Sequence, residues 1–139
     1  MPFDRDALAD AVAVHGTVAR IVLVHVKGSA PRPAGTSMLV WPGGSSGTIG
    51  GGQLELQSMK TAAAMLQSGP TIKIARTALG PSLNQCCGGA VTGVTEGFDS
   101  QRLEELQSDF PGIYLRQADA DAPALPATLR AKLRRANAA

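Results

Sequence analysis

Three glycine-bearing loops, each beside an apolar strand-forming stretch, constrain the fold of this sequence more than any other feature. They span residues 28–35, 47–52 and 80–89. The first follows a β-branched run at 19–26, and the third precedes an apolar run at 90–94. Because loops that join the strands of one sheet emerge at the strand ends, we predict that all three gather at one edge of a β-sheet.

Hydrophobic periodicity predicts a mixture of strands and helices along the chain. The expected strands cover residues 19–26, 36–41, 47–49, 71–77 and 90–94, and the expected helices cover 4–16, 53–67 and a short segment from 100. This mixture predicts an α+β or α/β fold, in which a small mixed β-sheet packs against about three helices. We expect no Rossmann domain, because the sequence contains no dinucleotide-binding fingerprint.

Capping residues and apolar spacing predict how the helices begin and which face they bury. Asp4 and Ser100 are the expected N-caps of the first and last helices. In the first helix, Leu8 and Val12 recur at helical spacing. The middle helix is expected to pack through one apolar face, formed by Leu56, Met59, Ala63 and Leu66.

The composition is that of an ordinary globular protein. With 139 residues, 44% of them hydrophobic and 17% charged, the chain suits one domain with a real core. No apolar run approaches the roughly 18 residues that span a bilayer, and the acidic start lacks the features of a signal peptide. We therefore expect a cytoplasmic protein without a membrane partner. Two cysteines give no disulfide framework, which agrees with a reducing compartment.

Basic residues are concentrated near the C-terminus, at Arg130, Lys132, Arg134 and Arg135. Only 4% of the residues are aromatic, so the chain lacks the stacking platform of a single-strand nucleic-acid protein. We expect no nucleic-acid partner. The predicted division is a domain at 1–112 followed by a loosely attached Ala/Pro-rich, basic tail at 113–139.

The adjacent thiols Cys86 and Cys87 are the only cysteines, and they carry the most specific chemical signal. Neighbouring Cα atoms are about 3.8 Å apart, whereas a conventional disulfide wants roughly 4.4 to 6.8 Å. We therefore expect two free thiols, which could bind something soft or accept a sulfur atom. The alternative is that both are small apolar fillers, but the flanking glycine, proline and amide residues are typical of an exposed loop.

The middle glycine loop is a candidate anion site. Gly50, Gly51 and Gly52 run directly into the predicted helix, whose first N–H groups and dipole attract negative charge. Arg32, held between two prolines, could add a planar donor fork for phosphate. The alternatives are a simple tight turn and an ordinary surface arginine. Zinc catalysis is poorly supported, because His15 and His25 share no metal-ligand spacing with the cysteines.

Three ordered segments together carry a resemblance to a known family. They read KGSAPRPAGTSMLV at 27–40, GTIGGGQLE at 47–55 and LGPSLNQCCGG at 79–89. In these segments the chain resembles the N-terminal domain of the XdhC/CoxI family, the xanthine dehydrogenase accessory proteins. The resemblance covers roughly residues 19–94 and is far more specific than any single glycine run.

The resemblance implies a molybdenum-cofactor chaperone rather than an enzyme. Such a protein binds molybdopterin, protects it while a cysteine desulfurase supplies a sulfido ligand, and hands it to an apo xanthine dehydrogenase-type molybdoenzyme. By this match, Gln85, Cys86 and Cys87 are assigned to the cofactor or sulfur-handling site, and either thiol could contact the molybdenum. The phosphate or pterin side is assigned to Gly50–Gly52 and Arg32.

Two departures from the family pattern limit what the resemblance implies. Full-length relatives usually continue into a Rossmann-like domain, so this chain is expected to be a natural short form or a fragment. Gln53 occupies a place where relatives often carry His, which weakens any acid–base role at that position.

Two other classes of function stay open at this point. One is a thiol-dependent enzyme that transfers sulfur through a persulfide on Cys86 or Cys87. The other is a non-catalytic interaction module whose strands pair with a partner or with a second copy to form a homodimer.

Overall fold

The computed structural model describes residues 4–28, 32–78 and 89–106. None of the helices in these ranges is both long and apolar enough to cross a membrane. In chain order the elements are α1 (Arg5–His15), β1 (Val18–Lys27), β2 (Ser37–Trp41), β3 (Gly44–Gly47), α2 (Gly52–Ser68), β4 (Ile72–Ala78), β5 (Ala90–Phe98) and α3 (Ser100–Glu105).

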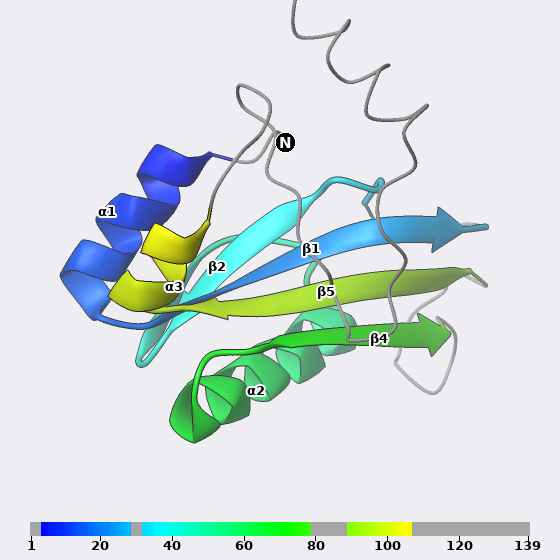
Figure 1. Cartoon of the computed structure of the whole chain (residues 1–139). Coiled ribbons are helices and arrows are strands. Elements are labelled where there is room, and N and C mark those ends of the chain that lie inside the picture. Colours follow the sequence, from blue (N-terminus) through cyan, green and yellow to red (C-terminus); the bar gives the residue numbers. More distant parts are fainter. Residues whose placement is uncertain (1–3, 29–31, 79–88, 107–139) are drawn as a thin grey trace, which may run out of the picture.

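The strands form one five-stranded sheet in the order β3-β2-β1-β5-β4, and every neighbouring pair is antiparallel. β1 lies at the centre and pairs with β5 along its whole length, from Val18 opposite Phe98 to Lys27 opposite Ala90. α2 covers one face of the sheet, while α1 and α3 cover one end of the other face (Figure 1). The fold is therefore α+β with three helices, the first of the two predicted classes, since helices and antiparallel strands are segregated.

α2 packs on the sheet through a face that only partly matches the predicted one, since Met59 and Leu66 pack against the core but Leu56 and Ala63 do not. Leu54, Ala62 and Met65 are its buried residues, whereas Leu56 is 45% exposed and Ala63 is exposed. Both sets recur at helical spacing, so the pattern alone does not choose between them. The small side chain of Ala62 allows the helix to approach the strands closely. A prediction that selects the buried face by its largest apolar residues does not identify this position.

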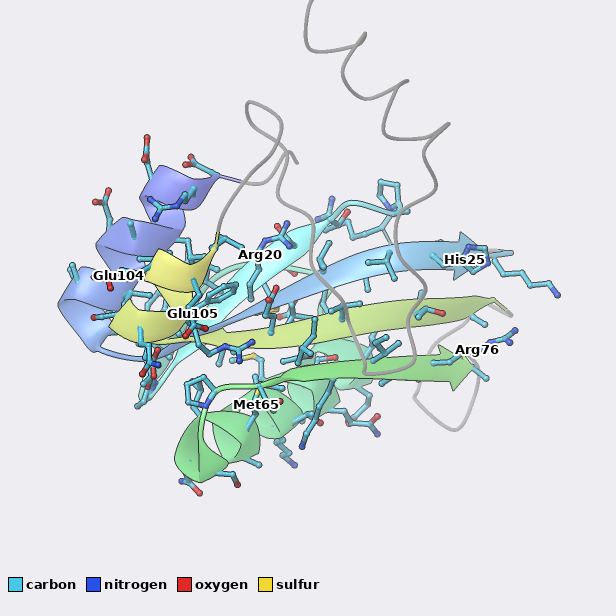
Figure 2. The ribbon with its side chains drawn as sticks, in the orientation of Figure 1. Arg20, His25, Met65, Arg76, Glu104 and Glu105 are labelled. Atoms are coloured by element: carbon cyan, nitrogen blue, oxygen red, sulfur yellow. The ribbon has the colours of Figure 1, made fainter. Side chains whose placement is uncertain are left out.

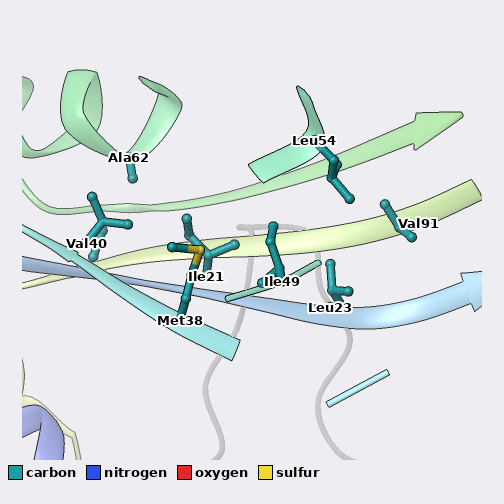
Figure 3. Packing of buried hydrophobic residues seen from close by; sticks show 9 residues of the cluster. Ile21, Leu23, Met38, Val40, Ile49, Leu54, Ala62 and Val91 are labelled. Carbon is teal, nitrogen blue, oxygen red and sulfur yellow. The ribbon is translucent and has the colours of Figure 1, made fainter. Parts of the chain in front are cut away.

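The core under α2 joins residues from four elements and from the loop before α2 (Figure 3). Its fully enclosed members come mainly from β1 and β2, and Ile49 in the loop is 0% exposed. The cluster consists of Ala19, Ile21, Leu23, Met38, Val40, Ile49, Leu54, Ala62 and Val91. Burial of this apolar surface, at roughly 25 cal/mol per Å², is the main stabilising contribution on this side of the sheet.

A second, smaller core lies under α1 and α3 on the opposite face. It consists of Leu8, Val12, Val18, Phe98 and Leu106, so the predicted apolar positions of the first helix are confirmed. The predicted N-cap Asp4 is also confirmed, because its Oδ1 accepts a hydrogen bond from the Ala7 N–H at 3.0 Å. In α3 the N-cap is Asp99 instead of Ser100, and its Oδ1 accepts from the Arg102 N–H at 2.8 Å.

The third strand also differs from its prediction. The expected strand at 47–49 is replaced by β3 at Gly44–Gly47, which pairs with β2 until Gly47 lies opposite Met38. Gly47 has φ +82°, a left-handed conformation that turns the chain out of the strand direction. Ile49 then turns into the core rather than continuing the sheet.

One aromatic contact joins α1 to β2 of the sheet. His15, the last residue of α1, stacks on Trp41 of β2 with ring centroids 4.0 Å apart and an interplanar angle of 9°. We predict that His15→Ala lowers the free energy of unfolding by about 1 kcal/mol, the usual scale of a stacked pair. Urea unfolding followed by Trp41 fluorescence measures it, since Trp41 is the only tryptophan.

Val14→Ala is the matched control, because Val14 is the preceding residue of the helix and is 76% exposed. This control is expected to stay within roughly 0.5 kcal/mol of the parent chain. Equal effects of the two substitutions would mean that the stacked rings contribute nothing specific.

Candidate functional site

The ends of three neighbouring strands define one end of the sheet, which we call the loop end. β1 ends at Lys27, β5 begins at Ala90 and β4 ends at Ala78. The register pairs Ala90 with Lys27 on one side and with Ala78 on the other, so the three positions form one row across the sheet (Figure 1). The segment 79–88 connects β4 to β5, and both of its attachment points therefore lie at the loop end.

The predicted thiol site belongs to that segment. Gln85, Cys86 and Cys87 lie outside the described residues, so their assignment stays a prediction. Among the described His, Cys, Asp and Glu residues, no three are placed to hold a metal ion.

A close backbone contact joins the first glycine loop to the third. Gly28, which directly follows β1, has φ +73°, and a Cβ added to it would lie 3.2 Å from the Cα of Gly89. Gly89 itself is buried. The contact requires a residue without a side chain at position 28, and it fixes the start of one loop against the end of the other.

The returning part of the first loop is tied back to β1. The Gly35 N–H donates to the Leu23 carbonyl at 2.6 Å, and the Leu23 N–H donates to the Thr36 carbonyl at 2.9 Å. Arg32 lies just before this connection and is exposed. Within the described ranges no hydrogen bond joins Arg32 to Gly50–Gly52, so the two predicted phosphate contacts are not brought into one hydrogen-bonded cluster.

The middle glycine loop reaches the same end of the molecule through the core. Ile49 and Leu54, on either side of the glycine turn, are buried in one cluster with Leu23 and Val91 (Figure 3). These two strand residues lie close to the loop end, so α2 also begins there. The contact of Gly28 with Gly89 confirms that the first and third loops meet at this edge of the sheet, whereas the middle loop is joined to them only through the shared core.

The glycine turn before α2 is organised by a carboxylate that the sequence analysis did not single out. Oε1 of Glu55 accepts hydrogen bonds from the Ile49 N–H at 2.9 Å and the Gly51 N–H at 3.2 Å, and from the Thr48 hydroxyl. The same hydroxyl oxygen accepts from the Gly50 N–H at 3.1 Å. One side chain from the first turn of α2 thus satisfies most of the donors of the loop that precedes it.

The charge of Glu55 is stabilised in this position. Burial alone would raise the pKa of Glu55, but the hydrogen bonds from Thr48, Ile49 and Gly51 outweigh it and lower the pKa below its ordinary value. The carboxylate is therefore ionised at neutral pH, next to the positive end of the helix dipole.

Glu55 bears directly on the predicted anion site at Gly50–Gly52. The loop does bind a negative charge, but the charge belongs to the protein itself. An external anion would have to take the place of the Glu55 carboxylate to use the Ile49 and Gly51 donors. The sequence signal for this arrangement is an acidic residue in the first turn of a helix that lacks a side-chain N-cap.

An open depression lies beside this turn on the first two turns of α2. Its volume is about 490 Å³, and it is lined by Gly52, Gln53, Glu55, Leu56 and Met59. Leu56, which the packing of α2 leaves exposed, gives it an apolar wall. Gln53 adds an amide that can both donate and accept hydrogen bonds. The depression could hold a flat, partly apolar ligand.

Together the sheet and its loop end define a small α+β domain whose first and third glycine loops meet at one site. Residues 11–76 match the sequence model of the XdhC and CoxI family. The matched region runs from α1 to β4 and includes the first two glycine loops. These residues are just under half of the chain, and over them the chain is similar to the XdhC and CoxI family.

A solved structure has the same fold. It is the crystal structure of a xanthine dehydrogenase from Bacillus halodurans, which superposes with a TM-score of 0.62 at 23% sequence identity. The match covers 76% of this chain and 34% of that chain, so the present chain spans about a third of the length of that protein. No curated protein matches the chain by sequence.

We predict that Gly28→Ala lowers the free energy of unfolding by about 1 to 2 kcal/mol. The added methyl is disfavoured at a positive φ and also meets the Gly89 backbone. Urea denaturation measures the effect. Gly16→Ala is the matched control, because Gly16 has φ +83° but open space around its Cβ position. If both substitutions cost the same, the contact with Gly89 contributes nothing.

We also predict that Glu55→Gln lowers the free energy of unfolding by roughly 1 to 2 kcal/mol at neutral pH. Because the folded state lowers the pKa of Glu55, this stabilisation is present above the ordinary carboxyl pKa and is lost as the pH falls through the lowered value. Urea denaturation of both proteins between pH 7 and pH 3 measures the difference.

Glu104→Gln is the control for Glu55, since Glu104 is an exposed carboxylate on α3. It is expected to change stability little at any pH. A difference between Glu55→Gln and the parent chain that stays constant down to pH 3 would contradict the role of the Glu55 charge.

Proposed function

We propose that this domain binds the molybdenum cofactor and protects it during sulfuration and insertion into a xanthine dehydrogenase-type molybdoenzyme. The observation that carries the proposal is the meeting of the first and third glycine loops at one end of the sheet, with the middle loop joined to them through the core, in a chain similar to the XdhC and CoxI family. The likeness to a protein described as a xanthine dehydrogenase supports the same context.

The chemistry of the loop end fits such a cargo. Molybdopterin carries a phosphate and a dithiolene, so it presents negative charge, a flat heterocycle and soft sulfur atoms. The described side chains at the loop end include exposed cations such as Lys27 and Arg32, and the depression beside α2 offers an apolar wall and an amide. The segment 79–88, attached at this end, carries two thiols that suit a soft metal centre.

Each residue then has a role in holding the cargo. Cys86 and Cys87 are proposed to shield or contact the molybdenum, with Gln85 beside them. Gly50–Gly52 and Arg32 are proposed to lie on the phosphate or pterin side of the cargo. Any phosphate bound at the glycine turn itself must displace the Glu55 carboxylate.

Holding, rather than turnover, is the role we assign to this domain. Glu55 is the acid closest to the glycine turn, and its lowered pKa keeps it ionised, so it cannot donate a proton at neutral pH. Sulfur would come from a cysteine desulfurase partner, and the loaded cofactor would pass to the apo-enzyme. The proposed domain spans 1–112, and its boundary with the tail at 113–139 lies outside the described residues.

We predict that the chain, mixed anaerobically with released molybdenum cofactor, retains molybdenum and pterin in nearly equal amounts after gel filtration. The double substitution Cys86→Ser and Cys87→Ser is expected to lower this retention at least about tenfold, because a hydroxyl is a poor ligand for a soft metal. Metal analysis and the fluorescence of the oxidised pterin quantify the two components.

The double variant must unfold at the same urea concentration as the parent chain, and Lys60→Gln on the exposed side of α2 is the binding control. Full retention by the cysteine variant would show that the thiols have no role. No retention by the folded parent chain would contradict the proposed function of the domain.

A further inference from the structure

Three side chains form a row across neighbouring strands close to the loop end. The register places His25 of β1 opposite Thr92 of β5, and Thr92 opposite Arg76 of β4. Adjacent strands lie about 4.8 Å apart, so the outer two Cα atoms are separated by about 10 Å. Figure 2 shows His25 and Arg76 at the same end of the sheet.

The row faces away from α2. Val91, the neighbour of Thr92, is 2% exposed and packs under α2 together with its register partner Val26. Because side chains alternate along a strand, Thr92 and its row lie on the opposite face. Among the described helices only α1 and α3 cover this face, and His25 and Arg76 are exposed. Neither makes a hydrogen bond or ion pair with another described residue.

The charge around the row has one sign. The described segments 21–28, 32–36, 71–78 and 89–95 contain no Asp or Glu, and their basic residues are His25, Lys27, Arg32, Lys73 and Arg76. Most of the described acids lie at the other end of the molecule, where Figure 2 labels Glu104 and Glu105. Apart from Glu55, which lies on the α2 side of the sheet and is engaged by the glycine turn, such a separation creates a positive potential that attracts anions to the loop end.

An apolar row lies directly beside the cationic one. Val22 is paired with Val94, and Val94 with Ile74, so three aliphatic side chains span the same three strands. Ile74 is 48% exposed, and Val24, at the irregularity in β1, is 50% exposed. A ligand with an anionic group and a flat apolar body could therefore contact both rows at once.

We propose that the row formed by His25, Thr92 and Arg76 binds the phosphate ester of a phosphorylated heterocycle whose ring lies over Val22, Val94 and Ile74. The inference rests on the proposed function and refines it, because it places the phosphate of the same cargo at this row instead of at Gly50–Gly52, where Glu55 engages the Ile49 and Gly51 donors. A guanidinium fork and an imidazole on either side of a hydroxyl supply convergent donors for phosphate. Unlike the donors of the glycine turn, these groups are not engaged by any carboxylate among the described residues.

The test titrates the isotope-labelled full chain with the phosphorylated pterin obtained by oxidising released molybdenum cofactor. The same pterin after phosphatase treatment is titrated in parallel. We expect the phosphorylated form to shift the backbone amide signals of Thr92 and Arg76. The double substitution His25→Gln and Arg76→Gln is expected to weaken its binding about tenfold and to leave the dephosphorylated form unaffected.

Lys73→Gln is the matched control, because it removes one positive charge from the same strand on the other face of the sheet. Loss of affinity that is equal for both pterins, or equal in Lys73→Gln and the row variant, would overturn the proposal. So would shifts confined to the Ile49 and Gly51 amides, which would place the phosphate at the glycine turn.

A third titration, with inorganic pyrophosphate, distinguishes failure of the proposed function from failure of this anion site. If neither pterin binds the parent chain but pyrophosphate shifts Thr92 and Arg76, and the row variant abolishes these shifts, the anion site stands without the cargo. If pyrophosphate also leaves Thr92 and Arg76 unshifted, the row is not an anion site.

Discussion

The pairing of β1 with β5 is the interaction on which the rest of the structure depends. It joins two segments that are distant in the sequence, and it runs from Val18 and Phe98 at one end to Lys27 and Ala90 at the other, with one irregularity between Leu23 and His25. The first end carries the core beneath α1 and α3, and the second end anchors the loops. Among the described strands β4 pairs only with β5, so the place of β4 in the sheet, and of its end at Ala78, also depends on this pairing.

Around the loop end, glycine and carboxylate chemistry set the backbone conformation. Because Gly28 has no side chain, the first and third loops can approach each other: a Cβ at position 28 would lie 3.2 Å from the Cα of Gly89. Glu55 holds the turn before α2 by accepting hydrogen bonds from the Ile49 and Gly51 N–H groups. The Glu55 contacts change the interpretation of the glycine turn. Its sequence resembles an anion-binding loop, but its N–H groups already bind a carboxylate of the protein itself. The exposed cations of β1 and β4 are then the better candidates for an external anion.

Local features of the sequence were predictable, and non-local ones were not. Asp4, the α1 positions Leu8 and Val12, and the α+β class follow from capping and periodicity. The buried face of α2 followed only in part, because Leu56 and Leu54 fit helical spacing equally well and only the sheet selects between them. Strand order, the contact of Gly28 with Gly89 and the row of His25, Thr92 and Arg76 require residues far apart in the chain to meet, which periodicity does not encode.

The central claim is that ligand binding takes place at the loop end of the sheet. Hydrogen exchange of the full chain, with and without released molybdenum cofactor under anaerobic conditions, tests it most directly. The account predicts slower exchange in peptides that contain the end of β1, the end of β4 and the start of β5, with α1 and α3 unchanged. Protection confined to α1 and α3, or no protection when cofactor is retained, would contradict it.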